Sequence, residues 1–365
     1  MAQIIDNGSG SGRRWTVRYR EPGGRSARQR EKSFERKRDA TDFATKVEND
    51  KREGVYIDPA AGRISVRKYA EEWLDAKEVA PSTAEAYERI MRLHVIPHLG
   101  GRTIAAVTTE DIEKLYAAWR RAGASPNTME TRRIPLSGLF AHATRHRRIR
   151  ESPVINSELP SAPSKSVDER ALPSRAEITL LADAIGPRLS PAVWLMALSG
   201  LRIGEALGVF SEDIQDGILR VRRQVIRTKG SCGKYEAFYA PLKHRKEGEW
   251  RDVPIPESFH ALVPRLPIVN NVEGMVNPDL VRKSWNRAIH RLGLPAYTPH
   301  DLRHKWATVT LSNGVPIHEV SRWMGHRTIS VTVDLYGHVT QDGADRCREV
   351  VRQAFDEPTV SERRP

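Results

Sequence analysis

The stretch HDLRHKWATVTLSNGVPIHEVSRWMGHRTISVTVDLYGH, residues 300–338, combines side chains that together can act on a negatively charged group. His300 and Arg303 stand three residues apart, His326 follows a glycine, and Tyr336 comes ten residues later. A phenol oxygen can act as a nucleophile once its proton is removed or its charge is stabilised. These residue types favour a phosphate site around Tyr336, provided that other parts of the chain complete it.

Length and charge restrict the class of protein. At 365 residues the chain is too long for one ordinary core, which predicts two or three domains. Its net charge of +13 predicts a polyanionic partner, either nucleic acid or an anionic membrane surface. No apolar run reaches the length of a membrane span, and the start MAQIIDNGSGSG lacks the apolar core of a signal peptide. We therefore expect a cytoplasmic protein with no membrane partner.

The composition gives no sign of a metal or cofactor site. The only cysteines are Cys232 and Cys347, too few for a disulfide framework or a cysteine-based zinc site. The 12 histidines form no H-E-x-x-H pattern and no cluster with cysteine. We expect neither metal nor cofactor.

Residues 1–57 predict a small, basic sheet-and-helix domain. Within residues 13–38, eleven Lys and Arg stand against three Glu. The alternating sequence RWTVRYR predicts a strand with apolar side chains on one face and arginines on the other. A Pro-Gly-Gly turn leads toward a second strand, and a helix is predicted over residues 36–52. A basic face of this kind is often only solvated, but the density of arginine favours DNA contact. The residues expected to contact DNA are Arg18, Arg20 and Arg28.

Residues 64–156 carry helical signals and predict an all-helical domain with its own core. Ser82-x-x-Glu85 matches a capping box, which would open a helix that Pro97 ends. Thr108 is the predicted N-cap of the next helix. Each of these signals comes from the local sequence alone.

The last helix of this segment is predicted over residues 127–146, and Pro135 inside it should kink it or split it in two. A cluster of basic residues follows in the sequence RHRRIR. Solvation aided by the helix dipole and contact with DNA phosphates are equally good interpretations of that cluster. The candidate DNA-binding residues are Arg145, Arg147 and Arg148.

Residues 157–170 form the predicted linker, because SELPSAPSKSVD is rich in Ser and Pro and lacks apolar periodicity. Residues 171–356 then predict a mixed α+β domain. Ser174-x-x-Glu177 matches a capping box, and the apolar helix SPAVWLMALSG should stop at Gly200.

Strand signals occupy the middle of this domain. They cover residues 218–228, 236–242 and 251–255, and the last two flank residues 243–249, a predicted hairpin tip that carries lysines. From Asn277 the signals are helical again.

The C-terminal part leaves one local conflict. Apolar residues between Ile329 and Tyr336 fit both a strand and a helical face. A further helix is predicted near residues 345–355, and residues 357–365 read as a flexible tail.

Five pieces of the sequence, taken in order, resemble the tyrosine recombinases of the phage integrase type. They are GLRIGEAL at residues 200–207, a lysine after Pro241-Leu242, HDLRH at 300–304, Gly325-His326, and Tyr336-Gly337-His338. Each piece alone is weak, whereas their order and spacing together are highly specific. The resemblance is firm over residues 172–339 and less specific before them. The N-terminal module resembles the arm-site-binding domain that some integrases carry.

The resemblance implies a multi-domain, mainly α-helical protein with small β-sheets, whose α+β catalytic domain adopts helix over residues 329–336. Arg202 and Arg303 would stabilise the negative charge that builds on the phosphate oxygens during attack. His300 would assist Tyr336 as a base and as a phosphate ligand.

The resemblance also implies supporting roles. Lys243 would protonate the leaving 5′-oxygen, and His326 would donate a hydrogen bond to a nonbridging oxygen. Glu205 and His304 would orient these groups, with Glu205 pairing with an arginine or with His304. Residues of the same type lie nearby and compete for the roles of Lys243 and Tyr336: Lys234, Arg245, Lys246, Tyr235 and Tyr297.

In the implied reaction, Tyr336 forms a 3′-phosphotyrosine bond and releases a 5′-hydroxyl, without ATP or metal. The domains at 64–156 and 171–356 would close around double-stranded DNA attachment sites, and four protomers would assemble on two sites. The helix near 345–355 would dock on a neighbouring protomer. The N-terminal module favours an integrase of a phage or mobile element. Whether an excisionase and a host DNA-bending protein take part stays open.

Two other functions remain as alternatives. An enzyme similar to type IB topoisomerases would use the same chemistry to nick and close DNA without joining partner sites. A non-catalytic DNA-binding protein would share the charge and the domains. The arm-like module disfavours the first, and the complete residue set disfavours the second.

Overall fold

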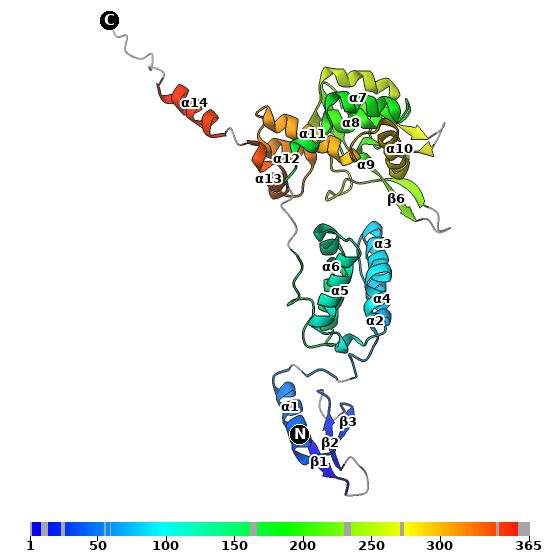
Figure 1. Cartoon of the computed structure of the whole chain (residues 1–365), viewed down its shortest axis with the longest axis vertical. Helices are drawn as coiled ribbons and strands as arrows, with labels where there is room; N and C mark the ends of the chain where they lie inside the picture. Colours follow the sequence, from blue (N-terminus) through cyan, green and yellow to red (C-terminus); the bar gives the residue numbers. More distant parts are fainter. Residues whose placement is uncertain are drawn as a thin grey trace. The chain divides into compact units, whose positions relative to one another are not determined.

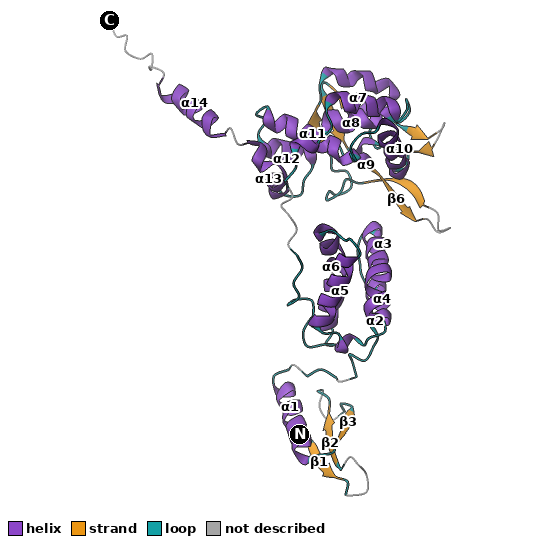
Figure 2. Ribbon diagram, viewed as in Figure 1, coloured by secondary structure: helices purple, strands orange, loops and turns teal. Residues whose placement is uncertain are grey.

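The computed structural model describes residues 2–8, 14–22, 26–54, 56–58, 60–160, 166–229, 235–270, 274–340 and 343–356. The chain divides into two compact units, residues 1–163 and 164–365 (Figure 1). Helices predominate and the sheets are small, which confirms the predicted fold class (Figure 2). In the described part of the chain no helix is long and apolar enough to cross a membrane. Several features of the sequence analysis fall wholly or partly outside the described residues: the Pro-Gly-Gly turn at 22–24, the linker at 157–170, Cys232, Lys234 and the tail at 357–365.

The first unit begins with a three-stranded antiparallel sheet in the order β1 (Gln3–Asp6), β2 (Trp15–Arg20), β3 (Gln29–Phe34). Helix α1 (Lys37–Arg52) packs on the sheet, and the apolar side chains between them form a small core. The predicted strand and helix are confirmed as β2 and α1. Strand β1 was not predicted, because its four residues are too short to show a clear alternation.

A helical subdomain with a separate core completes this unit. Its helices are α2 (Val66–Asp75), α3 (Pro81–Ile90), α4 (Ile96–Leu99), α5 (Thr109–Arg121) and α6 (Pro126–Arg145). Thr108 caps α5 as predicted, since its hydroxyl accepts from the Asp111 N–H while the Asp111 carboxylate accepts from the Thr108 N–H.

Two predictions for α3 are wrong. The helix starts at Pro81 with Ala80 as its N-cap, so Ser82 and Glu85 lie inside it and form no capping box. Proline suits the first helical turn because its fixed φ is already helical and its missing N–H is not needed there. Pro97 does not end the helix either. A π-helical turn at Met91–Val95 joins α3 to α4, which places Pro97 in a new first turn.

Pro135 lies inside α6, which runs as one helix of 20 residues. Of the two outcomes predicted for Pro135, a kink or a split, the split is therefore wrong. Pro135 itself is buried, together with Leu136, Leu139 and Phe140 on the same stretch. Packing of this apolar stretch against the subdomain core offsets the hydrogen bond that proline removes.

The second unit contains the remaining elements and has one large core, in which Phe259 and Trp285 are fully buried. Its helices are α7 (Arg175–Ala184), α8 (Ser190–Ser199), α9 (Ile203–Ala206), α10 (Pro278–Leu292), α11 (Pro299–Ser312), α12 (Ile317–Met324), α13 (Ile329–Tyr336) and α14 (Gly343–Asp356). Ser174 and Glu177 form the predicted capping box of α7. The ambiguous stretch before Tyr336 is a helix.

The strands of this unit differ from the prediction. The expected single strand is broken into β5 (Ile218–Val221) and β6 (Gln224–Lys229). Strand β6 pairs with β7 (Tyr235–Ala240), whereas β8 (Arg251–Pro254) pairs with β5, whose other neighbour is β4 (Ile214–Gln215). A two-stranded pair, β9 (Val269–Asn270) and β10 (Gly274–Met275), lies further along the chain.

Residues 243–249 are therefore not a hairpin tip between paired strands. They connect β7 of one sheet to β8 of another, and the hairpin of this region joins β6 to β7 instead. The apolar pattern of the sequence shows which residues form strands. It does not show the break after Val221 that places β5 and β6 in different sheets.

Gly200 ends α8 in the left-handed conformation, with φ 64° and ψ 23°. This turn carries the chain directly into α9. A Cβ at Gly200 would overlap the indole ring of Trp306 on α11, against which α8 packs. Glycine is thus needed here for two separate reasons, backbone conformation and close approach.

We predict that Gly200→Ala destabilises the protein more than Gly293→Ala. Gly293 ends α10 with nearly the same backbone, φ 64° and ψ 25°, but nothing lies within 4 Å of the position that a Cβ would take there. Both variants have the left-handed cost of about 1–2 kcal/mol, and only Gly200→Ala adds an overpacking cost of about 1–3 kcal/mol. Urea unfolding of the two variants measures the difference. Equal midpoints would show that the Trp306 contact does not matter.

Candidate active site

Arg202 follows the Gly200 turn and occupies the N-cap position of α9. Glu205, one turn later, holds it at two points. Its Oε2 accepts from the Arg202 backbone N–H at 2.9 Å, and its Oε1 accepts from the Arg202 Nη1 at 2.9 Å. The predicted pairing of Glu205 with an arginine is confirmed. A quarter of the surface of the Arg202 side chain remains exposed, so this side chain can still contact a ligand.

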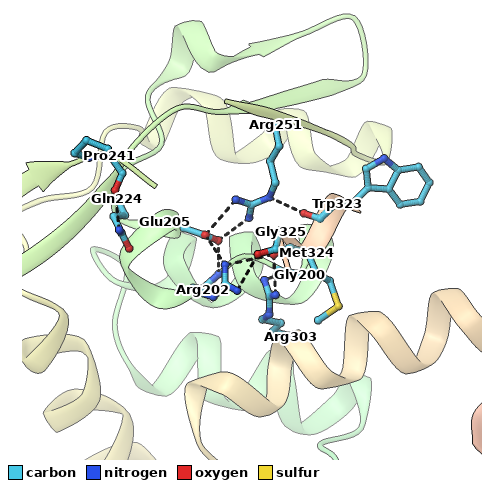
Figure 3. Close-up of polar contacts among 10 residues, drawn as sticks. All are labelled: Gly200, Arg202, Glu205, Gln224, Pro241, Arg251, Arg303, Trp323, Met324 and Gly325. Atoms are coloured by element: carbon cyan, nitrogen blue, oxygen red, sulfur yellow. Dashed lines mark hydrogen bonds and ion pairs between the residues drawn. The ribbon is translucent and has the colours of Figure 1, made fainter. Parts of the chain in front are cut away.

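Arg303 lies on α11 and is completely buried. Its Nη1 donates to the Gly200 carbonyl at 2.6 Å and its Nη2 donates to the Met324 carbonyl at 2.7 Å. Arg202 donates to the same Met324 carbonyl at 3.4 Å and to that of Gly325 at 3.2 Å (Figure 3). The structure therefore brings together two arginines that are 101 residues apart in the sequence.

The shared acceptor is the C-terminal end of α12. Carbonyls at a helix C-terminus have no partner inside the helix and carry partial negative charge, so they suit cations. Gly325 follows in the left-handed conformation, with φ 66°. A Cβ there would lie 3.2 Å from the guanidinium carbon of a third arginine, Arg251.

Arg251 was not predicted as a site residue. It begins β8, and its Nη1 and Nη2 donate to both oxygens of Glu205 at 3.1 and 2.6 Å, while its Nε donates to the Trp323 carbonyl at 2.6 Å (Figure 3). Side-chain exposure is 3% for Arg251 and 1% for Glu205. The alternation of RDVP could have revealed it, because Arg251 lies in phase with the buried Val253.

One carboxylate thus faces several guanidinium groups. Burial alone would raise the pKa of Glu205, but Arg251, then Arg202 and Arg303 outweigh it and lower that pKa to about 2. Burial, followed by the neighbouring Arg202, lowers the pKa of Arg303. An arginine stays protonated in proteins even so. The cluster therefore carries more positive than negative charge.

His300 and His326 lie close to the two predicted catalytic arginines. His300 is an exposed residue, yet desolvation by surrounding protein, then His304, Arg303 and Arg202, lowers its pKa to about 4. Burial, then Arg303 and Arg202, lowers the pKa of His326 to about 3. Both rings are neutral at pH 7, and each can donate one N–H and accept one hydrogen bond. The Nδ1 of His326 is hydrogen-bonded to the Thr332 hydroxyl on α13 at 2.8 Å.

Tyr336 ends α13 and is completely buried. Burial raises the pKa of its phenol, which Arg303 only partly opposes. Its hydroxyl lies 2.6 Å from Nδ1 of His304 on α11. The predicted nucleophile therefore lies next to the second histidine of HDLRH. Within the described residues, no hydrogen bond joins it to His300.

Lys243 follows β7 in the connection to β8 and is exposed. The segment around it is anchored, because the Gln224 amide donates to the Pro241 carbonyl at 2.8 Å and Leu242 is buried. The next residue, His244, has a φ of 65°. Burial, then Lys243, Arg327 and Arg202, lowers the pKa of His244, which indicates that this connection lies near Arg202.

The chain entering this unit also contacts the segment that carries Tyr336. The Val167 N–H donates to the Leu335 carbonyl at 3.0 Å. The Val167 carbonyl accepts from Nε2 of His338 at 2.9 Å. Val167 thus holds the residues on both sides of the tyrosine.

The candidate DNA-binding arginines lie in the first unit and are mostly exposed. Arg18 pairs with Glu31 across β2 and β3 at 2.6 Å, and Arg20 donates to the Ala27 carbonyl at 3.1 Å. Arg148 donates to the Ala61 carbonyl at 3.2 Å, which gives it a structural contact. The others are Arg28, Arg145 and Arg147, all exposed, with Arg147 at a φ of 53°.

Two guanidinium groups, two neutral histidines and a buried tyrosine on neighbouring elements suit an enzyme in which a phenol attacks a phosphate. Comparison with known proteins agrees with that class. The model described as "Phage integrase family" matches residues 176–342, and "Phage integrase, N-terminal SAM-like domain" matches residues 65–120.

Relatives and solved structures extend the match. A tyrosine recombinase XerC-like protein of Caldanaerobacter subterraneus subsp. tengcongensis is 25% identical over 310 residues, covering 75% of this chain and 78% of the relative. The tyrosine recombinase XerC of Mesorhizobium japonicum is 28% identical over 282 residues, covering 72% and 88%. The Tn1549 transposon integrase, solved with a circular intermediate DNA, has a TM-score of 0.65 at 20% identity, covering 79% and 99%. A lambda integrase dimer bound to a COC′ core site has a TM-score of 0.57 at 17% identity, covering 93% and 94%.

The chain belongs to the phage integrase family of tyrosine recombinases, and it is a site-specific recombinase.

We predict that Arg251→Met destabilises the protein by about 3–5 kcal/mol, because it removes one partner of a buried ion pair. Arg220→Met is the matched control on the neighbouring strand β5. Arg220 also forms a two-point contact with a carboxylate, Asp252, but both side chains are 41% exposed. Exposed pairs contribute little, so its unfolding midpoint should stay near that of the wild type. Denaturant unfolding measures both, and an equal loss in the two variants would contradict the importance of burial.

Proposed function

We propose that this protein is the integrase of a phage or mobile element and that it breaks and rejoins DNA through Tyr336. Arg202 and Arg303 bind the scissile phosphate, and Tyr336 attacks it to form a 3′-phosphotyrosine bond. The observation that carries this proposal is the pair of guanidinium groups on the Met324 carbonyl, beside the element that ends in Tyr336.

The charge of the cluster supports an anionic ligand. Glu205 offsets only part of the positive charge of Arg202, Arg251 and Arg303. An excess of positive charge therefore remains in a largely buried place. Arg303 also keeps a buried N–H, at Nε, that has no hydrogen-bond partner among the described residues. An unsatisfied buried donor on a cation is costly, and a phosphate would offset that cost.

The remaining predicted roles fit the same reaction. His300 and His326 are neutral, so each can donate a hydrogen bond to a phosphate oxygen without adding charge. Lys243, on the exposed connection between β7 and β8, protonates the 5′-oxygen as it leaves. The exposed position suits a residue that reaches the leaving group only when DNA is bound. No step requires a metal or another cofactor.

Assembly on DNA follows the family pattern in this proposal. Four protomers act on two double-stranded attachment sites, with residues 64–156 and 171–356 on the core site, joined by the linker at 157–170. Helix α14 exposes Val350 and Val351 by 63% and 49%, which suits docking on a neighbouring protomer. Lambda integrase has been solved as a tetramer bound to a Holliday junction. The protein would act in the cytoplasm of a bacterial host, with an excisionase and a host DNA-bending protein as optional partners.

The N-terminal domain, residues 1–57, binds separate arm sites in this proposal. Its sheet is covered by α1 on one face, and Arg18 and Arg20 are exposed on β2. Arg28, just before β3, is exposed as well. A two-stranded β-ribbon such as β2 with β3 fits the major groove of DNA. Arg145, Arg147 and Arg148 would add phosphate contacts near the core site.

We expect wild-type protein to form a covalent adduct at the 3′ phosphate of a nicked attachment-site duplex. In this substrate the short fragment that carries the released 5′-hydroxyl diffuses away, so the adduct is trapped. Tyr336→Phe should form none, because the nucleophilic oxygen is gone. Tyr297→Phe is the control, since it removes the hydroxyl of a competing tyrosine, one that donates to Glu177 instead. Denaturing gels that separate protein–DNA adducts measure the outcome. An adduct with Tyr336→Phe would show that another residue attacks.

We expect the triple variant Arg18→Ala, Arg20→Ala, Arg28→Ala to lose affinity for arm-site DNA and to retain it for core-site DNA. Each lost phosphate contact should reduce the slope of log K against log salt by about 0.9. The control removes the same charge from around α1, with Arg36, Arg38 and Lys46 changed to Ala, all of them exposed. Filter-binding titrations over a salt series measure both. Equal losses at arm and core sites would contradict a dedicated arm-binding sheet.

A further inference from the structure

The described structure supplies Tyr336 with a proton acceptor other than the histidine expected from the family resemblance. The resemblance assigned the base to His300, whereas the hydroxyl of Tyr336 lies 2.6 Å from Nδ1 of His304. In the described residues this hydroxyl makes no other hydrogen bond to a side chain. A buried phenol usually donates a hydrogen bond, and when Tyr336 is the donor, Nδ1 of His304 accepts and its Nε2 carries the hydrogen.

His300 and His304 occupy the same side of α11, one turn apart. Their rings meet edge to face with centroids 4.7 Å apart. The His304 ring centroid lies 5.8 Å from that of Tyr336. His304 therefore lies between His300 and Tyr336 along this chain of ring contacts. His300 is the histidine near Arg202 and Arg303, and His304 is the histidine next to the phenol.

We propose that His304 is a catalytic residue that takes the phenolic proton of Tyr336 as the phenol attacks DNA. In this step the bond between the Tyr336 oxygen and phosphorus forms, and the bond from phosphorus to the 5′-oxygen breaks. The phenolic proton moves to Nδ1 of His304, and the 5′-oxygen takes a proton from Lys243. The products are the 3′-phosphotyrosine and a 5′-hydroxyl, with no net gain or loss of charge beyond the two proton transfers.

The surroundings of His304 suit that role. Three groups of its own helix act on it, namely His300, Asp301 and Arg303, and Tyr336 faces it from α13. Burial lowers its pKa, Asp301 opposes this, and Arg303 adds to the lowering, so the ring is neutral at pH 7 and able to accept.

A route for the proton also exists. His304 borders a surface hollow of about 430 Å³ that is lined as well by Asp168, Arg170 and Asp301. Water in such a hollow can take up the proton that imidazolium releases after each cleavage. His300, by contrast, is influenced by both Arg303 and Arg202 in addition to His304 and Asp301, and closeness to two guanidinium groups fits a phosphate ligand better than a base.

This inference rests on the proposed function, and His304→Asn tests it. The Asn carbonyl can accept the hydrogen bond of Tyr336 but cannot take its proton at neutral pH. We expect the rate of adduct formation on the nicked duplex to fall by about 10²–10⁴-fold, the usual range for general-base catalysis. We also expect its pH profile to change. Wild-type cleavage should level off above the pKa of His304, whereas the variant should keep rising with pH, because only phenolate then reacts.

His300→Asn is the matched comparison on the same helix. Because His300 binds phosphate in this scheme, its loss should lower the rate and leave the levelling of the profile in place. A second measurement covers the case in which His304→Asn disturbs the fold. His304→Gly opens space beside the hollow, and added imidazole should restore its adduct formation by at least about tenfold, a modest part of the general-base contribution.

The outcomes separate the two proposals. If His304→Asn cleaves within a few-fold of wild type with an unchanged pH profile, or if His300→Asn alone loses the levelling, His304 is not the base. Failure of imidazole to rescue His304→Gly would count against it as well. A wild-type protein that forms no adduct on any attachment-site duplex would instead refute the proposed function.

Discussion

Three guanidinium groups converge on the C-terminal end of one helix, and two of them also bind the carboxylate of Glu205. Arg202 and Arg303 share the carbonyl of Met324, and Arg251 binds the carbonyl of Trp323 and both oxygens of Glu205. Placing like charges together in a protein interior costs several kcal/mol per ion unless partners offset it. The offset here is incomplete, because a single carboxylate and a few dipoles face three cations. In the proposed reaction, the negative charge of a DNA phosphate would complete this offset.

The need to bring these three arginines together explains the close contacts between distant segments of the second unit. The left-handed turn at Gly200 brings its carbonyl to Arg303 and leaves no room for a Cβ against Trp306. The turn at Gly325 lets the end of α12 approach Arg251. Arg251 begins strand β8, which pairs with β5, whereas Lys243 follows strand β7, which pairs with β6 in another sheet. The connection between β7 and β8 therefore has one end fixed by a buried ion pair, while Lys243 near its other end stays exposed.

Much of this was predictable from sequence, for reasons visible in particular residues. Thr108 and Ser174 cap their helices because a hydroxyl and a carboxylate three residues apart satisfy local donors. The clustering of Arg202, Arg303, His300, His326 and Tyr336 could be expected only from their order along the chain and its resemblance to a family. Local rules failed where longer-range packing decides. Pro97 and Pro135 are accommodated by a π-helical turn and a buried helix face, and β5 and β6 part into separate sheets. Arg251 escaped notice because a charged residue at the start of a strand is usually exposed.

Val167 attaches the residues that flank Tyr336, the proposed nucleophile, to the chain that precedes α7. Its N–H and C=O bond to Leu335 and His338, on either side of Tyr336. Coupling between two parts of a protein acts in both directions, so a shift of the backbone at Leu335 or of the ring of His338 would break these bonds or carry Val167 with it. Movement of the segment before α7 and movement of the residues on either side of Tyr336 are therefore mechanically linked through a single residue.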